Sequence, residues 1–351
     1  MNKSKCFFGV NSWRDCGFQL QGTKGLIVID KKVRDLHKHR VDKLLGVFSS
    51  VKEVIVDEVE KHKTLKYAEL ITQKALDFNL NRNDWVIGVG GGATLDLAGF
   101  FASIYKRGAN LCYLPTTIIA QVDSSYGGKT AVNFQGYKNQ LGSFYPANII
   151  GIDTSLLSTL NNREVYNGLG EIIKYIMLEP KTFKDADIDI TPLVNDESLD
   201  FEKIIPFCYQ IKIKYVNDDY YDKEGKRIAL NLGHTIGHAI EKQSEYPLGH
   251  GQAVAIGLHF SVYVAYSKGK LELDKVKYYY KLLKRIIPNV PYKNLTEYVT
   301  INLKQDKKVE REKVLFIYPV ELGWEKEWIK NESLVHYWTK FAEVNGNVDY
   351  F

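Results

Sequence analysis

Three histidines in the second half of the chain have a spacing that is typical of a metal site. His234 and His238 are four residues apart, so a helix would place both on one face. His250 follows later, and Glu171 lies earlier in the sequence Gly-Leu-Gly-Glu-Ile-Ile-Lys. Two histidines and one carboxylate form a common catalytic zinc set with one coordination position open for substrate. The spacing leaves open whether His238 or His250 completes the set, and unrelated histidines on two helices are the alternative.

A glycine cluster in the first half is typical of a phosphate-binding turn. Residues 88–93 read Gly-Val-Gly-Gly-Gly-Ala, between an apolar run at 85–89 and an apolar stretch at 93–105. Glycines between a strand and a helix let the backbone approach a pyrophosphate at the helix N-terminus. The match is imperfect, because a standard dinucleotide unit ends its next strand in an acid, whereas this one ends in Pro115-Thr116-Thr117. We therefore favour a nucleotide site of another design over a purely structural turn.

A second glycine-rich segment offers lysines and small hydroxyl groups. Gly127-Gly128-Lys129-Thr130 is followed by Lys138-Asn139. The segment lacks the first glycine of the Walker phosphate loop. Its composition still favours an anionic ligand, and the alternative is a surface loop with solvated lysines.

The elements that must position these residues change character along the chain. Apolar runs at 25–30, 51–56, 85–89 and 110–114 alternate with amphipathic stretches such as 65–78, and this alternation predicts a parallel α/β sheet. From about residue 161 onward the apolar spacing is mostly helical, for example at 204–216 and 229–240. We predict an α/β domain at 1–155 that carries the glycine turn, and a mostly helical domain at 156–351 that carries the histidines.

Composition excludes several classes of protein. The chain has 351 residues, of which 45% are hydrophobic and 25% charged, as in an ordinary globular protein. A net charge of +5 is too small to indicate nucleic-acid binding by itself, although it suits a pocket that gathers cations around an anionic substrate. Four widely spaced cysteines, no signal-peptide pattern and no long apolar run predict a cytoplasmic protein with reduced thiols and no membrane span.

A basic, tyrosine-rich segment at residues 275–285 allows two interpretations. Aromatic and cationic side chains together suit nucleic-acid binding. The same segment fits an amphipathic helix whose inward face is formed by Val276, Tyr279, Leu282 and Leu283. We favour the helix and predict no nucleic-acid partner.

These residues, together with further motifs, resemble the 3-dehydroquinate synthase family of sugar phosphate cyclases. The resemblance covers about residues 60–308, and its motifs follow one another in the family's order. They are Gly90-Gly91-Gly92 with Asp96, Arg107-Gly108, Pro115-Thr116-Thr117, the segments 121–125 and 127–133, Lys138-Asn139, Glu171-Ile172-Ile173-Lys174, Asn231-Leu232-Gly233-His234-Thr235, Gly237-His238-Ala239 and Asp306-Lys307-Lys308.

The resemblance implies an NAD-binding α/β domain, a helical metal domain and a homodimer. The implied NAD contacts are Asp30, Glu60, Lys63, Gly91, Gly92, Asp96, Thr116, Thr117, Asp123, Ser124, Lys129, Lys138, Thr159, Leu160 and Glu164. The implied ligands of a Zn²⁺ or Co²⁺ ion are Glu171, His234 and His250, which makes His238 a catalytic residue beside the metal. The implied substrate contacts are Lys129, Asn139, Lys174, Lys212, Arg227, Asn231 and Lys307 or Lys308, with Arg107 reaching the phosphate from the partner subunit.

The activity that the resemblance implies converts 3-deoxy-arabino-heptulosonate 7-phosphate to 3-dehydroquinate and phosphate. Transient oxidation by NAD makes a ketone, which acidifies the neighbouring C–H so that phosphate leaves by elimination. The hydride then returns, so NAD is not consumed, and ring opening with an internal aldol closure completes the carbocycle. A divalent metal polarises the reacting oxygens, and cationic side chains hold the phosphate.

The chain departs from the family pattern at several positions. Gln252 replaces a glutamate two residues after His250, which predicts weaker support for that ligand. Lys32 occupies the place of an adenosine contact, and Tyr126 replaces a small apolar residue beside the glycine loop. The family's acid–base residue has no unique match, and the candidates are Asp222 and Glu224.

Other activities stay open on the sequence alone. Cyclases that make 2-deoxy-scyllo-inosose or a valiolone use substrates without a carboxylate and have other residues at the positions of Arg227 and Asn231. The presence of both residues here favours the carboxylate-bearing substrate. A metal-dependent polyol dehydrogenase has a similar domain plan, but it lacks the Gly-Gly-Lys-Thr and Lys-Asn segments found here at residues 127–130 and 138–139. A non-catalytic paralogue finds support only in Gln252 and in the loosely matching N-terminus.

Overall fold

The computed structural model describes residues 4–347, apart from residues 196, 198, 224, 242–247, 306–308 and 311. The chain forms two compact units. Unit 1 contains the residues up to Asn161 together with Ile205–Ile213, and unit 2 contains Asn162–Ile204 and the residues from Lys214 onward. Among the described residues, no helix is long and apolar enough to cross a membrane.

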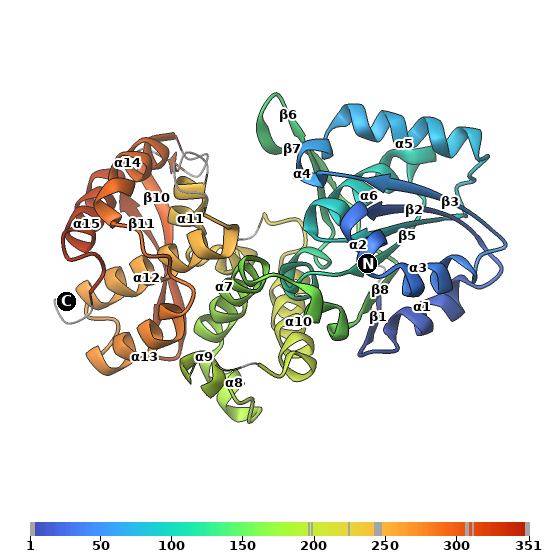
Figure 1. Cartoon of the computed structure of the whole chain (residues 1–351). Coiled ribbons are helices and arrows are strands. Elements are labelled where there is room, and N and C mark those ends of the chain that lie inside the picture. Colours follow the sequence, from blue (N-terminus) through green and yellow to red (C-terminus); the bar gives the residue numbers. More distant parts are fainter. Residues whose placement is uncertain are drawn as a thin grey trace. The chain divides into compact units, whose positions relative to one another are not determined.

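Unit 1 is built around a six-stranded parallel sheet (Figure 1). The strands of unit 1 are β1 (Lys5–Phe8), β2 (Lys24–Asp30), β3 (Ser50–Val56), β4 (Trp85–Gly90), β5 (Asn110–Pro115), β6 (Lys129–Phe134), β7 (Tyr137–Phe144) and β8 (Ile149–Ile152). Its helices are α1 (Ser12–Leu20), α2 (Lys31–Leu36), α3 (Lys38–Leu45), α4 (Val59–His62), α5 (Leu65–Asp77) and α6 (Gly92–Ile104), with short turns η1 (Tyr105–Arg107), η2 (Ala120–Ser124) and η3 (Thr154–Thr159).

The strand order of the sheet determines where a ligand can bind. The order is β1-β8-β5-β4-β2-β3, so the direction of winding reverses between β2 and β4. Such a reversal leaves a crevice at the carboxyl ends of the two strands, where open α/β sheets bind their ligands. Asp30 is the last residue of β2, and Gly90 is the last residue of β4. The fold therefore places the predicted glycine turn at this crevice.

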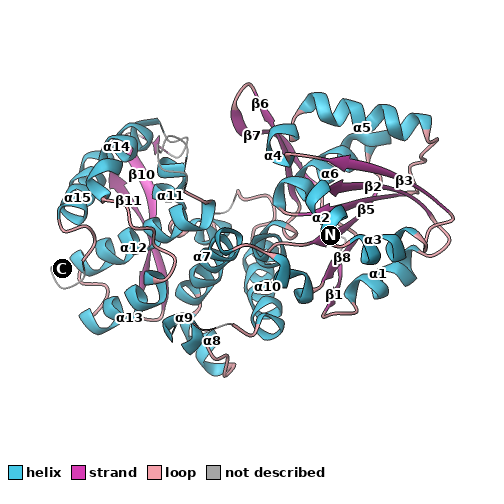
Figure 2. Ribbon diagram, viewed as in Figure 1, coloured by secondary structure: helices cyan, strands magenta, loops and turns pink. Residues whose placement is uncertain are grey.

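Helices cover both faces of the sheet (Figure 2). On one face, Cys16 and Leu20 of α1 lie in a buried cluster with Ile27 of β2. On the other face, α6 lies so close to β4 that a Cβ at Gly88 would be 3.0 Å from the Cβ of Ala98. The apolar runs of the inner strands β2, β4 and β5 are thus buried on both sides, as the strands of parallel sheets are, whereas the edge strand β3 is only partly buried. The predicted parallel α/β fold is confirmed.

Four strands of unit 1 were not among those predicted from the sequence. The edge strands β1 and β8 have four residues each, which is too short for a periodic pattern. The lysine-bearing segment, predicted as a loop, is instead the antiparallel hairpin of β6 and β7, in which Lys129 pairs with Phe144. Because successive residues of a strand face opposite sides, Lys129 is exposed while Thr130 is buried.

Unit 2 is mostly helical, as predicted, and also holds an antiparallel sheet in the order β11-β10-β9. Its helices are α7 (Asn162–Leu178), α8 (Pro180–Asp185), α9 (Thr191–Asn195), α11 (His234–Glu241), α12 (His250–Ser267), α13 (Leu273–Lys284), α14 (Thr296–Gln305) and α15 (Asn331–Glu343), with turns η4 (Arg227–Asn231) and η5 (Tyr292–Leu295). Its strands are β9 (Val309–Glu310), β10 (Lys313–Val320) and β11 (Gly323–Lys330), and α10 (Phe201–Asp218) has residues in both units.

Helix α13 confirms the amphipathic interpretation of the tyrosine-rich segment. Its buried residues are Val276, Tyr279, Leu282 and Leu283, which are the four predicted to point inward.

The predicted continuous helix at residues 229–240 is wrong. The turn η4 ends at Asn231, and the backbone of Leu232 is extended. Gly233 has a φ of +77°, a left-handed conformation that glycine adopts without steric cost. The helix α11 begins only at His234, so Arg227 and His234 do not share one helical register.

Close approach at glycines brings three helices of unit 2 together. A Cβ at Gly170 of α7 would lie 2.5 Å from the carbonyl oxygen of Gly251 in α12. A Cβ at Gly257 of α12 would lie 1.9 Å from the carbonyl oxygen of Gly233, next to the start of α11. No side chain fits at these distances, so only glycine lets the backbones meet. The start of α12 thereby lies against α7, and the middle of α12 lies against the residue that precedes α11.

Candidate functional site

Glu171, His234 and His250 meet in unit 2 at the place where the three helices converge. Glu171 lies in α7, and the two histidines are the first residues of α11 and α12. The Nε2 atoms of His234 and His250 lie 3.2 and 3.3 Å from Glu171 Oε1. The ligand atoms of the three residues lie within 4.8 Å of one another. Two imidazole nitrogens and one carboxylate oxygen are a donor set that fits a divalent ion such as Zn²⁺.

The charge of Glu171 is balanced inside the protein. Its side chain is 1% exposed, and its Oε2 forms an ion pair with the ammonium group of Lys174, one turn further along α7. Burial raises the pKa of Glu171, but Lys174, His234 and the hydrogen bond from His250 together hold this pKa well below its usual range. The carboxyl group is therefore ionised at neutral pH, which metal binding requires.

The two nitrogen atoms of each histidine have different partners. Nδ1 of His234 lies 3.0 Å from the carbonyl oxygen of Leu232, which can only accept a hydrogen bond. Nδ1 of His250 lies 3.0 Å from Oε2 of Glu241, and an ionised carboxylate also only accepts. Both rings thus carry a proton on Nδ1 and turn Nε2 toward Glu171. Sequence reasoning missed Glu241, although it lies seven residues after His234 and therefore on the same face of α11.

A second group of candidate ligands shares one histidine with the first. It consists of His238, Glu241 and His250. The ring of His238 is 5.2 Å from that of His234, and the residue is exposed. His250 points its Nε2 toward Glu171 of the first group and its Nδ1 toward Glu241 of the second. A single ring nitrogen of His250 therefore cannot bind an ion in both groups. The buried carboxylate of Glu171 favours the first group and leaves His238 beside it.

Gln252, which was predicted to weaken the support of His250, bonds to the backbone at the start of its helix. Oε1 of Gln252 accepts a hydrogen bond from the backbone N–H of the N-cap residue Gly249 at 3.2 Å at the start of α12. Glutamine performs this role as well as glutamate does. The acceptor that contacts His250 is Glu241, on another helix.

The glycine turn of unit 1 lies at the N-terminus of α6, with Thr117 and Ser124 close to its backbone. Gly91 is the N-cap, and α6 begins at Gly92. A Cβ at Gly92 would lie 2.9 Å from Oγ of Ser124, and one at Gly91 would lie 3.3 Å from Cγ2 of Thr117. Gly91 and Gly92 thus leave little space for a side chain of their own, and the N–H groups of the turn sit at the positive end of a helix. These features fit the pyrophosphate of a dinucleotide.

The acid that the glycine motif lacks after β5 is supplied by the neighbouring strand. Asp30 ends β2, which pairs directly with β4. Its Oδ1 accepts a hydrogen bond from the backbone N–H of Lys32 at 2.8 Å, which caps α2. Burial raises the pKa of Asp30, and its hydrogen bonds to backbone N–H groups oppose that rise. Asp30 and the glycine turn therefore lie on the two strands that border the crevice.

Lys63 connects several predicted residues of unit 1. Its ammonium group lies 2.5 Å from Asp96 Oδ2 and donates to Asn139 Oδ1 at 2.6 Å. The chain of hydrogen bonds continues from the N–H of Asn139 to Oδ1 of Asn133 at 3.0 Å, and from Nδ2 of Asn133 to Oε1 of Glu60 at 3.1 Å. Burial raises the pKa of Asp96, while Lys63 acts in the opposite direction. Residues predicted to contact NAD and substrate thus belong to one network.

A second lysine of unit 1 contacts another predicted NAD residue. The ammonium group of Lys212 lies 2.9 Å from Oδ1 of Asp123 and 2.5 Å from its carbonyl oxygen. Tyr126, the departure from the family pattern, is buried, and its ring lies 4.2 Å from that of Tyr209. Because Tyr209 precedes Lys212 by one turn of α10, Tyr126 packs the glycine-rich loop against that helix.

Arg227 lies in a loop of unit 2 that Asp219 organises. Arg227 is 5% exposed, and its Nη1 donates to the carbonyl oxygen of Tyr220 at 2.8 Å. Asp219 is also buried and accepts hydrogen bonds from the N–H of Lys223 at 2.8 Å and of Arg227 at 3.4 Å. Sequence reasoning missed Asp219, because no periodic pattern distinguishes it from the other acids nearby. Of the two acid–base candidates, Asp222 is exposed.

The other predicted residues differ in their exposure. Thr116 is buried and donates its N–H to the carbonyl oxygen of Gly90 at 3.0 Å. The exposed ones are Arg107, Lys129, Lys138 and Thr159, and the partly exposed ones are Thr117, Ser124, Leu160, Glu164 and Asn231. Glu224, Lys307 and Lys308 lie outside the described residues.

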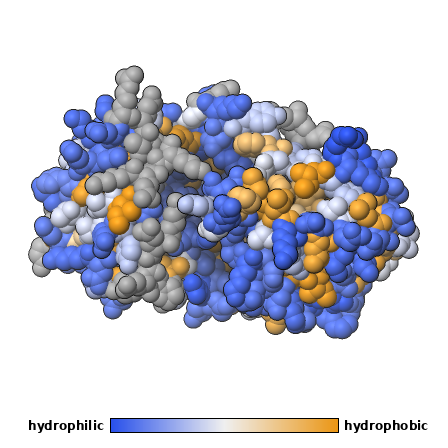
Figure 3. Space-filling view, turned by 90° about the horizontal axis from the view of Figure 1, so that it is seen from above, coloured by the Kyte–Doolittle hydropathy of each residue, from blue (hydrophilic) through white to orange (hydrophobic). Residues whose placement is uncertain are grey.

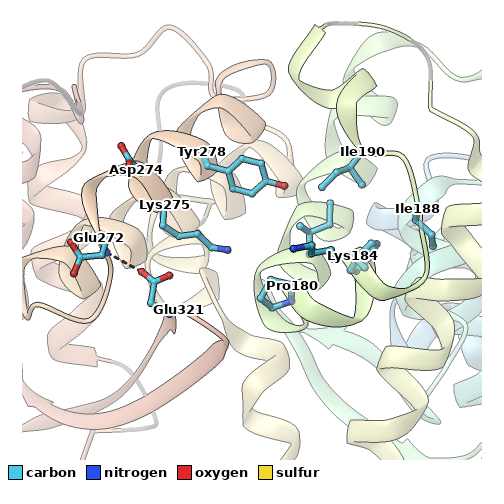
Figure 4. Close-up of a pocket in the computed structure, with 11 residues that line it drawn as sticks. Pro180, Lys184, Ile188, Ile190, Glu272, Asp274, Lys275, Tyr278 and Glu321 are labelled. Carbon is cyan, nitrogen blue, oxygen red and sulfur yellow. Dashed lines mark hydrogen bonds between the residues drawn. The ribbon is translucent and has the colours of Figure 1, made fainter.

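One pocket of unit 2 lies apart from all these residues (Figure 4). It has a volume of about 580 Å³. Lys275 and Tyr278 of α13 face it from one side, and Pro180 and Lys184 of α8 face it from the other. None of the predicted metal, NAD or substrate residues lines it. We therefore place the candidate site at the histidine cluster of unit 2 and at the crevice of unit 1 that holds the glycine turn.

Comparison with known proteins agrees with these observations. The family models for the 3-dehydroquinate synthase N-terminal and C-terminal regions match residues 53–167 and 168–309. The chain is 38% identical to the 3-dehydroquinate synthase of Natranaerobius thermophilus, over 85% of this chain and 83% of that protein. It is 37% identical to the enzyme of Pyrococcus abyssi, over 87% of this chain and 89% of that protein.

A solved structure shares the fold. It is a 2-deoxy-scyllo-inosose synthase complexed with carbaglucose-6-phosphate, NAD⁺ and Co²⁺, with a TM-score of 0.81 and 24% identity over 95% of this chain and 96% of that one. At that identity the likeness concerns the fold alone. The two family models and the identity to curated relatives over most of the chain show that this protein belongs to the 3-dehydroquinate synthase family.

Proposed function

We propose that this protein is a 3-dehydroquinate synthase, which converts 3-deoxy-arabino-heptulosonate 7-phosphate to 3-dehydroquinate and phosphate. The observation that carries the proposal is the meeting of Glu171, His234 and His250 in a chain of this family. The buried guanidinium group of Arg227, in the same unit, supports a substrate that bears a carboxylate.

The metal site is proposed for Glu171, His234 and His250, with His238 as a catalytic residue beside it. A bound Zn²⁺ or Co²⁺ ion would supply Lewis acidity toward the oxygens of the substrate. The chain's own contribution is to keep the carboxylate ionised and to turn Nε2 of both histidines toward it. Lys174, paired with Glu171, is proposed to contact the substrate as well.

The dinucleotide site is proposed for the crevice of unit 1, with Gly91 and Gly92 facing the pyrophosphate and Asp30 facing the adenosine. A bound NAD would supply a hydride acceptor that returns the hydride within the same turnover. The remaining proposed contacts are Glu60, Lys63, Asp96, Thr116, Thr117, Asp123, Ser124, Lys129, Lys138, Thr159, Leu160 and Glu164. The 2-deoxy-scyllo-inosose synthase of the same fold was solved with NAD⁺ and Co²⁺, which supports both cofactors.

The substrate's anionic groups would be held by cations. We assign the carboxylate to Arg227, because a guanidinium group offers two parallel N–H donors that match it. We assign the phosphate to Lys129, to Lys307 or Lys308, and to Arg107 supplied by a partner subunit. Lys212, Asn139 and Asn231 are proposed to position the rest of the molecule, which holds the reacting atoms in one pose for the aldol closure.

A homodimer in the cytoplasm is proposed as the working form. The hairpin of β6 and β7 exposes the large apolar side chains of Phe134, Tyr137, Leu141 and Phe144. Hydrophobic side chains are also visible on the face of unit 1 in Figure 3. Contiguous exposed apolar surface marks interaction sites in soluble proteins. Light scattering should give the mass of two chains, and the mass of one chain at working concentration would refute the dimer.

The test of the function is a substrate screen on the metal-loaded protein with NAD, read out as released phosphate. Heptulosonate phosphate should be the best substrate, and the organic product should be 3-dehydroquinate. The second candidate is a cyclase for a sugar phosphate without a carboxylate, which the shared fold of 2-deoxy-scyllo-inosose synthase favours. If glucose 6-phosphate or sedoheptulose 7-phosphate is turned over faster, that second candidate replaces the first.

A further inference from the structure

The last residue of α11 contacts a proposed metal ligand on the helix that follows. Oε2 of Glu241 lies 3.0 Å from Nδ1 of His250. His234, at the other end of α11, is a proposed ligand of the same ion. One helix therefore carries a ligand at its first residue and the partner of another ligand at its last, two turns apart on the same face.

The two ligand histidines are held by acceptors of different strength. The Nδ1 of His234 faces the neutral carbonyl oxygen of Leu232, whose position is fixed by the left-handed backbone of Gly233. The Nδ1 of His250 faces an ionised carboxylate. The two contacts are equally long, at 3.0 Å, so the difference lies in the charge of the acceptor: a carboxylate draws more of the proton's positive charge away from the ring than a neutral carbonyl does. The ring of His250 is thereby made the more basic of the two.

We propose that Glu241 is a positioning residue for the metal site: it accepts the Nδ1–H of His250, fixes the orientation and tautomer of that ring, and strengthens Nε2 as a ligand. Carboxylate–histidine–metal relays of this kind typically change metal affinity by about 10–100-fold when the carboxylate is removed. This inference rests on the proposed metal set, and it extends that set to a residue that does not touch the ion.

Neighbouring residues cannot replace Glu241 in this role. Gln252, on the same helix as His250, uses its Oε1 to accept the N–H of Gly249. His238 carries no carboxylate oxygen. Oε1 of Glu171 faces the Nε2 side of both histidines. Among these groups, Glu241 is the one that holds the Nδ1 side of His250.

The experiment measures Zn²⁺ affinity by competition with a chromogenic chelator on metal-stripped full-length protein, without NAD or substrate. Glu241→Ala should weaken Zn²⁺ binding by about 10–100-fold. Glu241→Gln should weaken it less, because the amide oxygen still accepts the Nδ1–H but carries no charge. The matched control is Glu332→Gln, which makes the same charge change at an exposed site in the first turn of α15 and should leave the affinity unchanged.

Two results would overturn the proposal. If both Glu241 variants bind Zn²⁺ as tightly as the parent protein, the contact between Glu241 and His250 does not contribute to metal affinity. If Glu241→Ala loses Zn²⁺ affinity as completely as Glu171→Ala does, Glu241 is a direct ligand of the ion, as it would be in the group of His238, Glu241 and His250. If Glu241→Ala fails to fold, Glu241→Gln decides: a several-fold weaker affinity supports the proposal, and parent affinity rejects it.

The spectrum of the Co²⁺-loaded protein provides an independent readout. A positioning residue leaves the set of ligand atoms intact, so Glu241→Gln should keep the visible absorption bands of the parent protein while Co²⁺ binds more weakly. A changed band pattern would contradict the assignment. Neither measurement uses turnover, so a protein that proves to be another kind of cyclase would refute the proposed function and leave this inference standing.

Discussion

The carboxylate of Glu171 contacts one ammonium group and two imidazole rings, and its two oxygen atoms have different roles. Its Oε2 pairs with the Lys174 ammonium group, whereas its Oε1 faces the Nε2 atoms of His234 and His250. The ammonium group keeps the carboxyl ionised in a buried place, where an isolated charge would be costly. The other oxygen is thereby presented, already charged, between two imidazole nitrogens. A single buried residue thus sets both the charge and the direction of the proposed metal site.

Arg227 is the residue that should distinguish one substrate from another. Arg227→Lys should weaken heptulosonate phosphate binding by about 1–3 kcal/mol, since an ammonium group cannot match both carboxylate oxygens and leaves a charge-assisted hydrogen bond unmade. The measurement is KM for that substrate, together with metal content and NAD affinity, which should not change.

The control for this prediction is the same substitution at Arg14, an exposed residue of α1. Arg14→Lys should leave KM unchanged. If Arg227→Lys has the KM of the parent enzyme, Arg227 does not hold the carboxylate. Its hydrogen bond to Tyr220 would then be purely structural.

At the scale of elements, the site depends on how closely α7, α11 and α12 approach. The added Cβ of Gly257→Ala would lie 1.9 Å from the carbonyl oxygen of Gly233, which no rotamer change can relieve. The helices must separate, so the metal-free protein should lose about 1–3 kcal/mol of unfolding free energy. Zn²⁺ affinity should fall as well, because Gly233 precedes His234. Urea denaturation and chelator competition measure the two effects.

Gly46→Ala is the matched control for packing at a glycine. Gly46 has a φ of −67°, and its Cβ would lie 3.5 Å from the nearest atom, an ordinary contact. The unfolding free energy should then change by no more than about 0.5 kcal/mol. A stable Gly257→Ala protein with parent metal affinity would contradict the close approach on which the site depends.

A histidine that the site does not use should make unit 2 sensitive to acid. His259 of α12 is fully buried among the rings of Tyr280, Tyr292 and Phe341, and burial lowers its pKa from 6.5 to about 3. In the unfolded chain His259 therefore binds a proton below pH 6.5, whereas in the folded chain it binds one only below about pH 3. In that window this residue should reduce the unfolding free energy by up to about 1.4 kcal/mol for each pH unit of acidification.

The variant His259→Leu, of similar volume, should remove that contribution. Urea denaturation at several pH values between about 5 and about 8 would compare the pH dependence of its unfolding free energy with that of the parent protein. Above pH 7 the two slopes should agree, since His259 is neutral in both folded and unfolded chains. Equal slopes below pH 6.5 would show that the folded protein accepts the proton, in conflict with the depressed pKa of His259.

The sequence predicted the elements that have strong local patterns. The runs at 25–30 and 85–89 became β2 and β4 because nearly all their residues are apolar, with Asp30 as the polar end of the first run. The spacing of Val276 and Tyr279 indicated the buried face of α13. The edge strands β1 and β8 are too short to produce such a pattern. The helix break at Gly233 was missed because the sign of its φ is decided by the crossing of α11 and α12.

The candidate site was accessible from the sequence only in part. The residue types of the histidine cluster indicated metal binding, but the choice between His238 and His250 needed either the family resemblance or the direction of each ring. The acid beside the glycine turn, Asp30, lies about sixty residues before it, and only the strand order makes them neighbours. Glu241 was missed because its contact with His250 depends on where α11 and α12 meet.

At the scale of the whole molecule, the two units contribute different parts of one proposed reaction. Unit 1 offers a crevice that fits a dinucleotide, and unit 2 offers a donor set that fits a divalent ion. If the hydride is returned within each turnover, the enzyme needs NAD as a catalyst and not as a reagent. That requirement separates a synthase of this family from a polyol dehydrogenase with a similar division of the chain.

The recycling of NAD in the proposed reaction is tested by counting the products formed per molecule of NAD. The metal-loaded protein is given heptulosonate phosphate in large excess over a trace of NAD, and phosphate, 3-dehydroquinate and NADH are measured together. We expect many phosphates released per NAD, one 3-dehydroquinate for each phosphate, and no accumulation of NADH. Turnover that stops when NADH has formed in proportion to the added NAD, or phosphate released without 3-dehydroquinate, would contradict this expectation.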